Sequence, residues 1–111
     1  MQFLLLLYEN EQRWSHGYPP SEMSEYRDFG KEFANAIKGG NALQPTSTAA
    51  TVRVRDGKRL ATDGPFAETK EQLGGFYLIE AKDRDEAIAI AAKIPSARFG
   101  GVEVRPILTF S

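Results

Sequence analysis

The sequence contains no cysteine and a single histidine, His16, in 111 residues. Without cysteine, the chain has no disulfide, no thiol nucleophile and no thiolate ligand for a metal. A lone histidine would need several converging carboxylates to hold a metal ion, so we predict no metal site. The lack of cysteine also suits a reducing compartment, and we expect the protein to be cytoplasmic.

The chain also lacks a clear excess of either charge and any long hydrophobic run. Fourteen Lys and Arg residues against fifteen Asp and Glu residues leave a formal net charge of −1, so we predict that nucleic acid is not a partner. No apolar stretch approaches the about 20 residues that cross a bilayer. The run at residues 3–7 has no basic segment before it, as a signal peptide would, and we expect a buried strand there.

The composition that is present is typical of one globular domain. Hydrophobic residues make up 41% and charged residues 26% of the chain, a balance that argues against disorder. The length is sufficient for a single core but not for two, so we predict one domain over residues 1–111. Neither a glycine-rich phosphate loop nor a nucleophile elbow is visible, and we predict no cofactor.

The first third of the chain predicts a strand and a helix. Residues 2–8 are apolar at nearly every position, which is typical of a central strand. A helix is expected from an N-cap at Ser21 to Gly39 and Gly40, where glycine allows a left-handed cap. Its apolar side chains recur every three or four residues and predict a core-facing stripe. These residues are Met23, Tyr26, Phe29, Phe33 and Ile37.

A β-hairpin is predicted in the middle of the chain. Residues 51–55 and 58–62 flank Asp56 and Gly57, a two-residue turn whose positive φ angles match the twist of paired strands. Residues 76–80 then form a second dense apolar strand.

The last third predicts a helix and a strand. Asp83, with Glu86 three residues later, resembles a capping box at the start of a helix over residues 87–94, which Pro95 ends. The final strand is expected at residues 102–107. The predicted core positions of this helix are Ala87, Ile88 and Ala91.

This order of elements predicts an α+β fold of the ferredoxin-like βαββαβ kind. Two helices would cover one face of an antiparallel sheet. The other face would then expose an apolar surface that is rare on a monomer, and a second copy of the chain is its simplest cover. We therefore predict a homodimer.

The segment at residues 63–75 is the most unusual in the sequence. Asp63, Gly64, Pro65 and Phe66 form a turn in which proline has no N–H and an aspartate can accept backbone N–H groups. Glu68 and Lys70 follow closely. A rigid turn that carries a carboxylate, an aromatic ring and nearby charges suits a preorganised small-molecule site.

These residues resemble the DGPF-motif branch of the YCII-related protein family. The resemblance implies a ferredoxin-like fold that forms a dimeric α+β barrel with a cleft between subunits, and no established reaction for most members. It also implies a regulatory context, because relatives are often encoded beside extracytoplasmic-function sigma factors. The matching segments are residues 3–8, 42–45, 51–57, 63–80 and 102–106.

The chain departs from the wider family at the positions linked to catalysis. The resemblance implies a histidine near the start of the first helix and an aspartate late in the chain. No histidine lies in the expected first helix, and the late segment from Ile94 through Ser96 to Arg98 has no carboxylate. The His and Asp pair is therefore not carried over to this protein.

The candidate site residues centre on the DGPF turn. Asp63 is the candidate polar anchor or proton acceptor, although a turn-capping aspartate needs no ligand to explain it. His16 has a side chain suited to act as a base at neutral pH, although a lone histidine in a polar loop is more often only solvated. The candidate ligand contacts are Tyr8, Arg53, Gly64, Pro65, Phe66, Glu68 and Lys70.

Two functions remain open from the sequence. In the first, the protein is a dimeric small-molecule binder or a cofactor-free enzyme with its site at the DGPF turn. In the second, it is a regulatory module whose DGPF turn is architectural and whose partner is another protein, such as a sigma factor. The residues decide neither the reaction nor the ligand.

Overall fold

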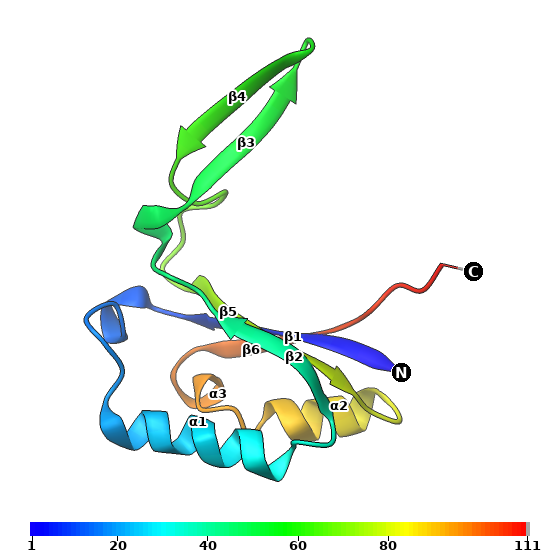
Figure 1. The fold of residues 1–111 in the computed structure, drawn as a ribbon. Coiled ribbons are helices and arrows are strands. Elements are labelled where there is room, and N and C mark those ends of the chain that lie inside the picture. The colour runs from blue at the N-terminus through cyan, green and yellow to red at the C-terminus, as the bar shows by residue number, and fades with distance from the viewer. Residues whose placement is uncertain (111) are drawn as a thin grey trace.

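The computed structural model describes residues 1–110 and has a four-stranded antiparallel sheet in the order β2-β5-β1-β6. Figure 1 shows the helices gathered on one face of this sheet. This order is the ferredoxin-like arrangement, and the predicted fold class is confirmed. The strands are β1 (Gln2–Glu9), β2 (Ile37–Ala42), β5 (Gln72–Glu80) and β6 (Gly101–Pro106), and the helices are α1 (Pro20–Glu32), α2 (Arg84–Ala91) and the short α3 (Ser96–Phe99).

The core lies between the sheet and the helices. Along β1, Phe3, Leu5 and Leu7 are buried and alternate with partly exposed residues, because successive side chains of a strand point to opposite faces. Burial of one such leucine contributes about 1.5–3 kcal/mol to stability. The buried cluster also takes Phe29 from α1 and Ile79 from β5. The predicted central strand is therefore confirmed.

The predicted end of the first helix was wrong. Helix α1 ends at Glu32, and Ile37 begins β2, an edge strand that pairs with β5. Gly40 lies so close to β5 that a Cβ atom there would come within 2.6 Å of the Phe76 carbonyl oxygen. The two glycines are therefore residues of a strand and do not cap a helix. The helix begins at Pro20, with Pro19 as N-cap and no side-chain cap, so Ser21 is not the N-cap.

The hairpin is confirmed, but it forms a sheet of its own. Strands β3 (Ala50–Arg55) and β4 (Lys58–Asp63) pair only with each other, and Figure 1 shows them projecting from the domain on the side away from the helices. Asp56 and Gly57 have φ angles of 52° and 75°, as a two-residue turn requires. The core sheet therefore takes its second strand from Ile37–Ala42.

The C-terminal half has the predicted order of helix and strand, but the predicted helix bounds were wrong. Helix α2 spans Arg84–Ala91 and not residues 87–94, and Pro95 precedes α3 and does not end α2. Asp83 accepts a hydrogen bond from the Glu86 N–H at 2.8 Å, and the Glu86 carboxylate accepts one from the Lys82 N–H at 3.0 Å. Ala87 and Ala91 are buried, but Ile88 is exposed, so that core prediction was wrong. Strand β6 begins one residue earlier than expected, at Gly101.

Candidate functional site

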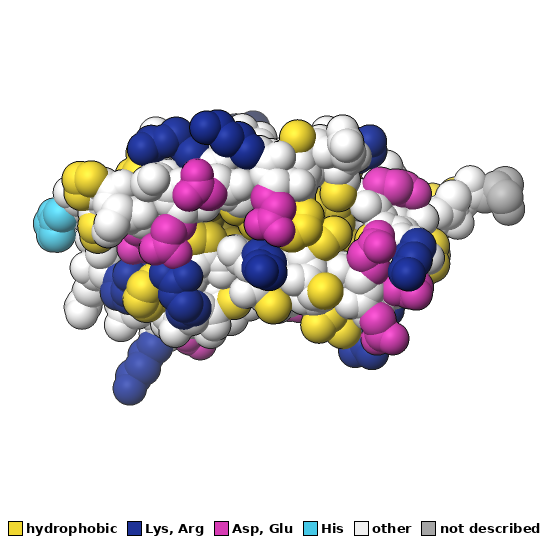
Figure 2. Space-filling model, turned by 90° about the horizontal axis from the view of Figure 1, so that it is seen from below, with side chains coloured by type: hydrophobic (Ala, Val, Ile, Leu, Met, Phe, Trp, Pro, Cys, Tyr) yellow, Lys and Arg dark blue, Asp and Glu magenta, His cyan; other side chains and the backbone are white. Residues whose placement is uncertain are grey.

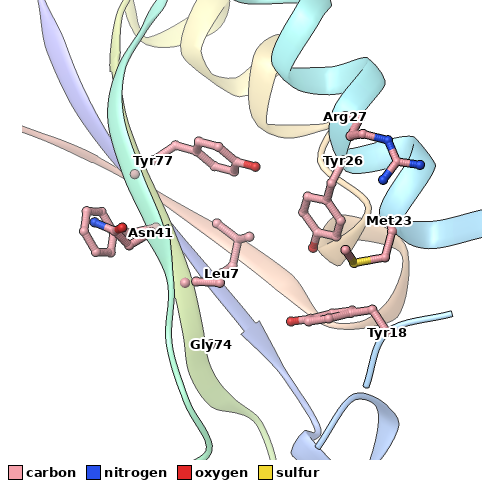
Figure 3. A pocket seen from close by; sticks show the side chains of 12 residues that line it. Leu7, Tyr18, Met23, Tyr26, Arg27, Asn41, Gly74 and Tyr77 are labelled. Atoms are coloured by element: carbon pink, nitrogen blue, oxygen red, sulfur yellow. The ribbon is translucent and has the colours of Figure 1, made fainter. Parts of the chain in front are cut away.

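A pocket of about 510 Å³ lies between α1 and the β2–β5 side of the sheet. We call it the aromatic pocket. Figure 3 shows the hydroxyl groups of Tyr18, Tyr26 and Tyr77 pointing into the same space, with Met23 beside them and Arg27 further out. Figure 2, which views the helix-covered side, shows hydrophobic atoms exposed between charged side chains.

Three separate elements position these tyrosines. Tyr18 comes from the loop before α1 and stacks on Trp14, with ring centroids 5.6 Å apart and an interplanar angle of 2°. Tyr26 lies on α1 and meets Tyr18 edge-on at 6.0 Å. Tyr77 comes from β5 and packs against Phe29 at 5.0 Å. The predicted core stripe on the helix thus includes residues that line a pocket, and Met23 is exposed there.

A buried ionic network lies behind the aromatic pocket. The exposed fractions of Glu9 and Glu22 are both 4%, and that of Ser96 is 1%. The Arg13 guanidinium donates to a Glu9 oxygen at 2.6 Å and to a Glu22 oxygen at 3.0 Å. The Ser96 hydroxyl donates to the second Glu9 oxygen at 2.7 Å, and the Tyr26 hydroxyl lies 2.7 Å from the same Ser96 oxygen. We call these five residues the buried network.

The charges in this region are unequal, because two carboxylates share one guanidinium. Burial raises the pKa of Glu22, and the positive charge of Arg13 only partly opposes that effect. Arg13 also lies over the Phe99 ring, with its guanidinium carbon 3.6 Å from the ring centroid. The network therefore carries one formal negative charge, and both of its carboxylates are buried.

The tyrosines at the pocket remain neutral near physiological pH. Burial raises the pKa of Tyr18 to about 12 and is also the main cause of the raised pKa values of Tyr26 and Tyr77. A neutral phenol both donates and accepts a hydrogen bond. The pocket therefore offers apolar walls with three hydroxyl groups at its centre.

A small cavity of about 10 Å³ is lined by residues of both the aromatic pocket and the buried network. Its lining includes Glu9 and Ser96 from the network and Leu7 and Tyr18 from the aromatic pocket. That volume is close to the roughly 10–15 Å³ that one water molecule needs.

The DGPF turn lines a different hollow, of about 450 Å³. Four of the candidate residues meet there, namely Gly64, Pro65, Glu68 and Lys70. The turn is held by backbone contacts: the Gly64 N–H donates to the Ala49 carbonyl at 2.8 Å, and Gly64 has a φ of 106°. Within residues 1–110, the exposed Asp63 carboxylate accepts no hydrogen bond, in contrast to the prediction that it could accept backbone N–H groups.

The remaining predicted site residues lie apart from this hollow. The Arg53 guanidinium carbon is 4.9 Å from the centroid of the Phe66 ring, and this contact joins the hairpin to the DGPF turn. The Phe66 side chain is 75% exposed. Tyr8 lies on the sheet face away from the helices, and His16 is exposed in the turn after a 3-10 helix at Glu11–Arg13. Their roles in ligand binding stay predictions.

Sequence reasoning missed both the aromatic pocket and the buried network. The only local signal was the spacing of Glu9 and Arg13, which are four residues apart outside any α-helix. Glu22 lies in the first turn of α1, and Ser96 is the first residue of α3. The structure shows that both belong to the buried network.

The described residues lack both a cluster of metal-ligating side chains and a helix that could cross a membrane. Within residues 1–110, no group of three or more His, Asp or Glu side chains is arranged to hold a metal ion. Over the same residues, no helix has both the length and the apolar character needed to span a bilayer.

The chain is similar to known proteins over its whole length. It is 38% identical over 117 aligned positions to an uncharacterised protein of Rhizobium meliloti (strain 1021), with 99% of this chain and 94% of that protein covered. Among solved structures, it is similar to the 5-chloro-2-hydroxyhydroquinone dehydrochlorinase of Burkholderia phenoliruptrix AC1100 in complex with 2,5-dihydroxybenzoquinone. That match has a TM-score of 0.48 and 16% identity, and it covers 97% of this chain and 94% of that one. The family description "YCII-related domain" matches residues 1–111, and the chain therefore belongs to the YCII-related family.

Proposed function

We propose that this protein binds a small, largely apolar molecule in the aromatic pocket. The observation that carries this proposal is the convergence of three neutral tyrosine hydroxyls on a hollow of about 510 Å³. Small-molecule sites typically measure about 300–1,000 Å³ and combine apolar walls with a few well-placed polar groups.

The lining indicates the kind of ligand. Tyr18 and Tyr26 present ring edges and faces that favour a flat apolar body, and aromatic contacts contribute about 0.5–1.5 kcal/mol beyond area burial. Met23 adds a flexible and polarisable wall. The hydroxyl groups require a ligand with at least one hydrogen-bonding oxygen or nitrogen. A compact aromatic molecule, or a quinone of similar size, fits these requirements.

Filling the pocket tests this proposal. We expect Met23→Trp to weaken binding of compounds found in an aromatic ligand screen by at least about tenfold, because an indole would occupy the hollow. Ten-fold corresponds to about 1.4 kcal/mol. Ile88→Trp is a matched control, since Ile88 is also exposed on a helix and does not line the pocket. Isothermal titration calorimetry with each compound measures the dissociation constant for wild type and for both variants.

The same screen also tests the DGPF turn as the ligand site. A compound that loses affinity in Asp63→Asn but binds Met23→Trp normally would place the site at the DGPF turn and contradict the proposal for the aromatic pocket. Asp63→Asn removes the charge and preserves the shape of the exposed side chain. We expect Asp63→Asn to leave the affinity within about twofold.

We further propose that a second copy of the chain covers the sheet face away from the helices. On β1 and β5, the partly exposed side chains of Leu4, Leu6, Phe76 and Leu78 form an apolar strip on this face. The β3–β4 hairpin projects on the same side (Figure 1), and its Val52 and Val54 are 60% and 61% exposed. A two-stranded hairpin alone is marginal in water, so both features favour a packed partner.

A charge placed in this strip tests the dimer. We expect wild-type protein at micromolar concentration to sediment as a dimer and Leu6→Glu to sediment as a monomer, because an unpaired carboxylate cannot be buried at low cost. Ile88→Glu, on the opposite side of the molecule, should remain dimeric. A wild-type monomer in sedimentation equilibrium would contradict the dimer, and it would leave the face open to a different protein, such as a sigma factor.

A further inference from the structure

We infer that Tyr26, Ser96 and Glu9 form a proton relay that removes the proton of an acidic hydroxyl group, a phenol or an enol, bound in the aromatic pocket. This inference deepens the function proposed above and rests on it. The relay runs from the hydroxyl of Tyr26 at the pocket, through the Ser96 hydroxyl, to the Glu9 carboxylate.

The direction of the relay follows from the number of protons available. The Ser96 hydroxyl has one proton, and it donates that proton to the Glu9 Oε2 atom at 2.7 Å. The contact of 2.7 Å between the Tyr26 and Ser96 hydroxyls must then have Tyr26 as donor. The Tyr26 oxygen keeps its lone pairs, so it can accept a hydrogen bond from a ligand hydroxyl in the pocket.

The far end of the relay can take up a proton because its charges are unbalanced. Glu9 and Glu22 are both buried, and Arg13 is the single cation between them. A proton that arrives at Glu9 removes the unmatched negative charge and leaves one Arg13–Glu22 pair. A buried excess charge is costly, so its neutralisation offsets part of the cost of forming an anion in the pocket.

The transfer balances without an oxidant or a cofactor. The ligand O–H bond breaks as a new O–H bond forms at Tyr26. The original Tyr26 proton moves to Ser96, and the original Ser96 proton moves to Glu9. The products are a ligand oxyanion and a neutral Glu9, with Tyr26 and Ser96 regenerated. The Tyr26 hydroxyl then donates to the new oxyanion, as donors at charge-developing atoms do in active sites.

The relay requires a ligand hydroxyl that is more acidic than an ordinary one. A simple phenol has a pKa of about 10, so an unactivated phenol or alcohol keeps its proton near neutral pH. The hydroxyl group of an acidified phenol, or of the enol of a dicarbonyl compound, is acidic enough for the relay to act. The pocket therefore selects acidic planar hydroxyl compounds.

A chromogenic phenol makes the relay visible. We would titrate the protein with 4-nitrophenol at a pH one unit below the pKa of the free probe, because phenol and phenolate differ in absorbance. We expect binding to wild-type protein to raise the phenolate fraction, with at least a tenfold shift in the ionisation equilibrium of the bound probe. Ser96→Ala and Tyr26→Phe should each abolish most of this shift.

The controls separate the relay from the pocket. Ser24→Ala removes a hydroxyl from the exposed side of α1 and should leave the shift intact. Thermal unfolding of Ser96→Ala checks that the variant is folded. An unchanged shift in folded Ser96→Ala would overturn the relay, and so would a wild-type protein that binds the probe without ionising it.

The two proposals fail in different ways. A probe that binds without ionising, and whose binding Met23→Trp weakens, overturns the relay and leaves the ligand pocket standing. A wild-type protein that does not bind the probe overturns the inferred ligand class. The screen with Met23→Trp then decides separately whether the pocket binds other molecules.

Discussion

Arg13→Met is expected to lower the free energy of unfolding by about 3 kcal/mol at neutral pH. Arg13 is the only cation that contacts the buried carboxylates of Glu9 and Glu22 among the described residues. Removal of one partner from a buried ion pair typically costs about 3–5 kcal/mol, and the partial exposure of Arg13 favours the lower end. Urea unfolding at a fixed protein concentration measures the change.

The loss should depend on pH in a defined direction. Burial raises the pKa of Glu22 in the folded state above its ordinary value of 4.5, and loss of Arg13 would raise it further. A carboxyl with a raised folded-state pKa binds its proton more readily when folded, so it destabilises the protein most at high pH. The deficit of Arg13→Met should therefore shrink as the pH falls from neutral toward 4.5.

Arg98→Met is the matched control for this prediction. Arg98 pairs with Glu25 at 2.6 Å, but both side chains are exposed. Surface ion pairs contribute about 0–1 kcal/mol, so the control should lose little stability. Equal losses in the two variants, or a deficit of Arg13→Met that stays constant with pH, would contradict the role assigned to the buried network.

Gly100→Ala is expected to cost at least about 3 kcal/mol, at the upper end of the usual range for overpacking. A Cβ atom at Gly100 would lie 2.0 Å from the Tyr8 carbonyl oxygen and 3.0 Å from the Glu9 Cα atom. These are backbone atoms of β1, which cannot move away without disturbing its pairing with β6. Chemical unfolding followed by far-UV circular dichroism measures the loss.

The neighbouring glycine provides the control. A Cβ atom at Gly101 would meet nothing within 4 Å, so Gly101→Ala should stay within about 1 kcal/mol of wild type. Gly100 also donates its N–H to the Ser96 carbonyl at 2.8 Å. A displaced Gly100 should therefore move Ser96 and reduce probe ionisation in the pocket as well. A stable Gly100→Ala protein would show that β1 and this segment are less closely packed than described.

The elements that the sequence predicted well depend on local chemistry. The alternation along β1, the positive φ angles at Asp56 and Gly57, and the Asp83 cap each involve residues within a few positions of one another. Such patterns can be recognised without knowledge of any tertiary contact. The same reasoning extended α1 too far, because Ile37 follows Phe33 at a helical spacing of four residues.

The strand at Ile37–Ala42 exists because a neighbour is available. Its short and glycine-rich sequence has little β-propensity, and pairing with the edge of β5 supplies the hydrogen bonds that stabilise it. The position of the aromatic pocket likewise depends on tertiary contacts that the sequence pattern does not indicate. The unusual sequence of the DGPF turn drew attention to Asp63 and Phe66. The lining of the aromatic pocket includes Met23 and Tyr26, which the helical pattern predicted as ordinary core.

The sequence by itself determined the fold class, the hairpin turn, the second helix and the membership of a family. Each of these depends on short-range patterns or on a contiguous motif. Only the tertiary structure decided the route of the second core strand, the separation of the hairpin from the main sheet, and the meeting of Glu9, Arg13, Glu22, Tyr26 and Ser96. These five residues come from segments up to 87 positions apart. Their interaction depends on burial in one small volume, which no local spacing specifies.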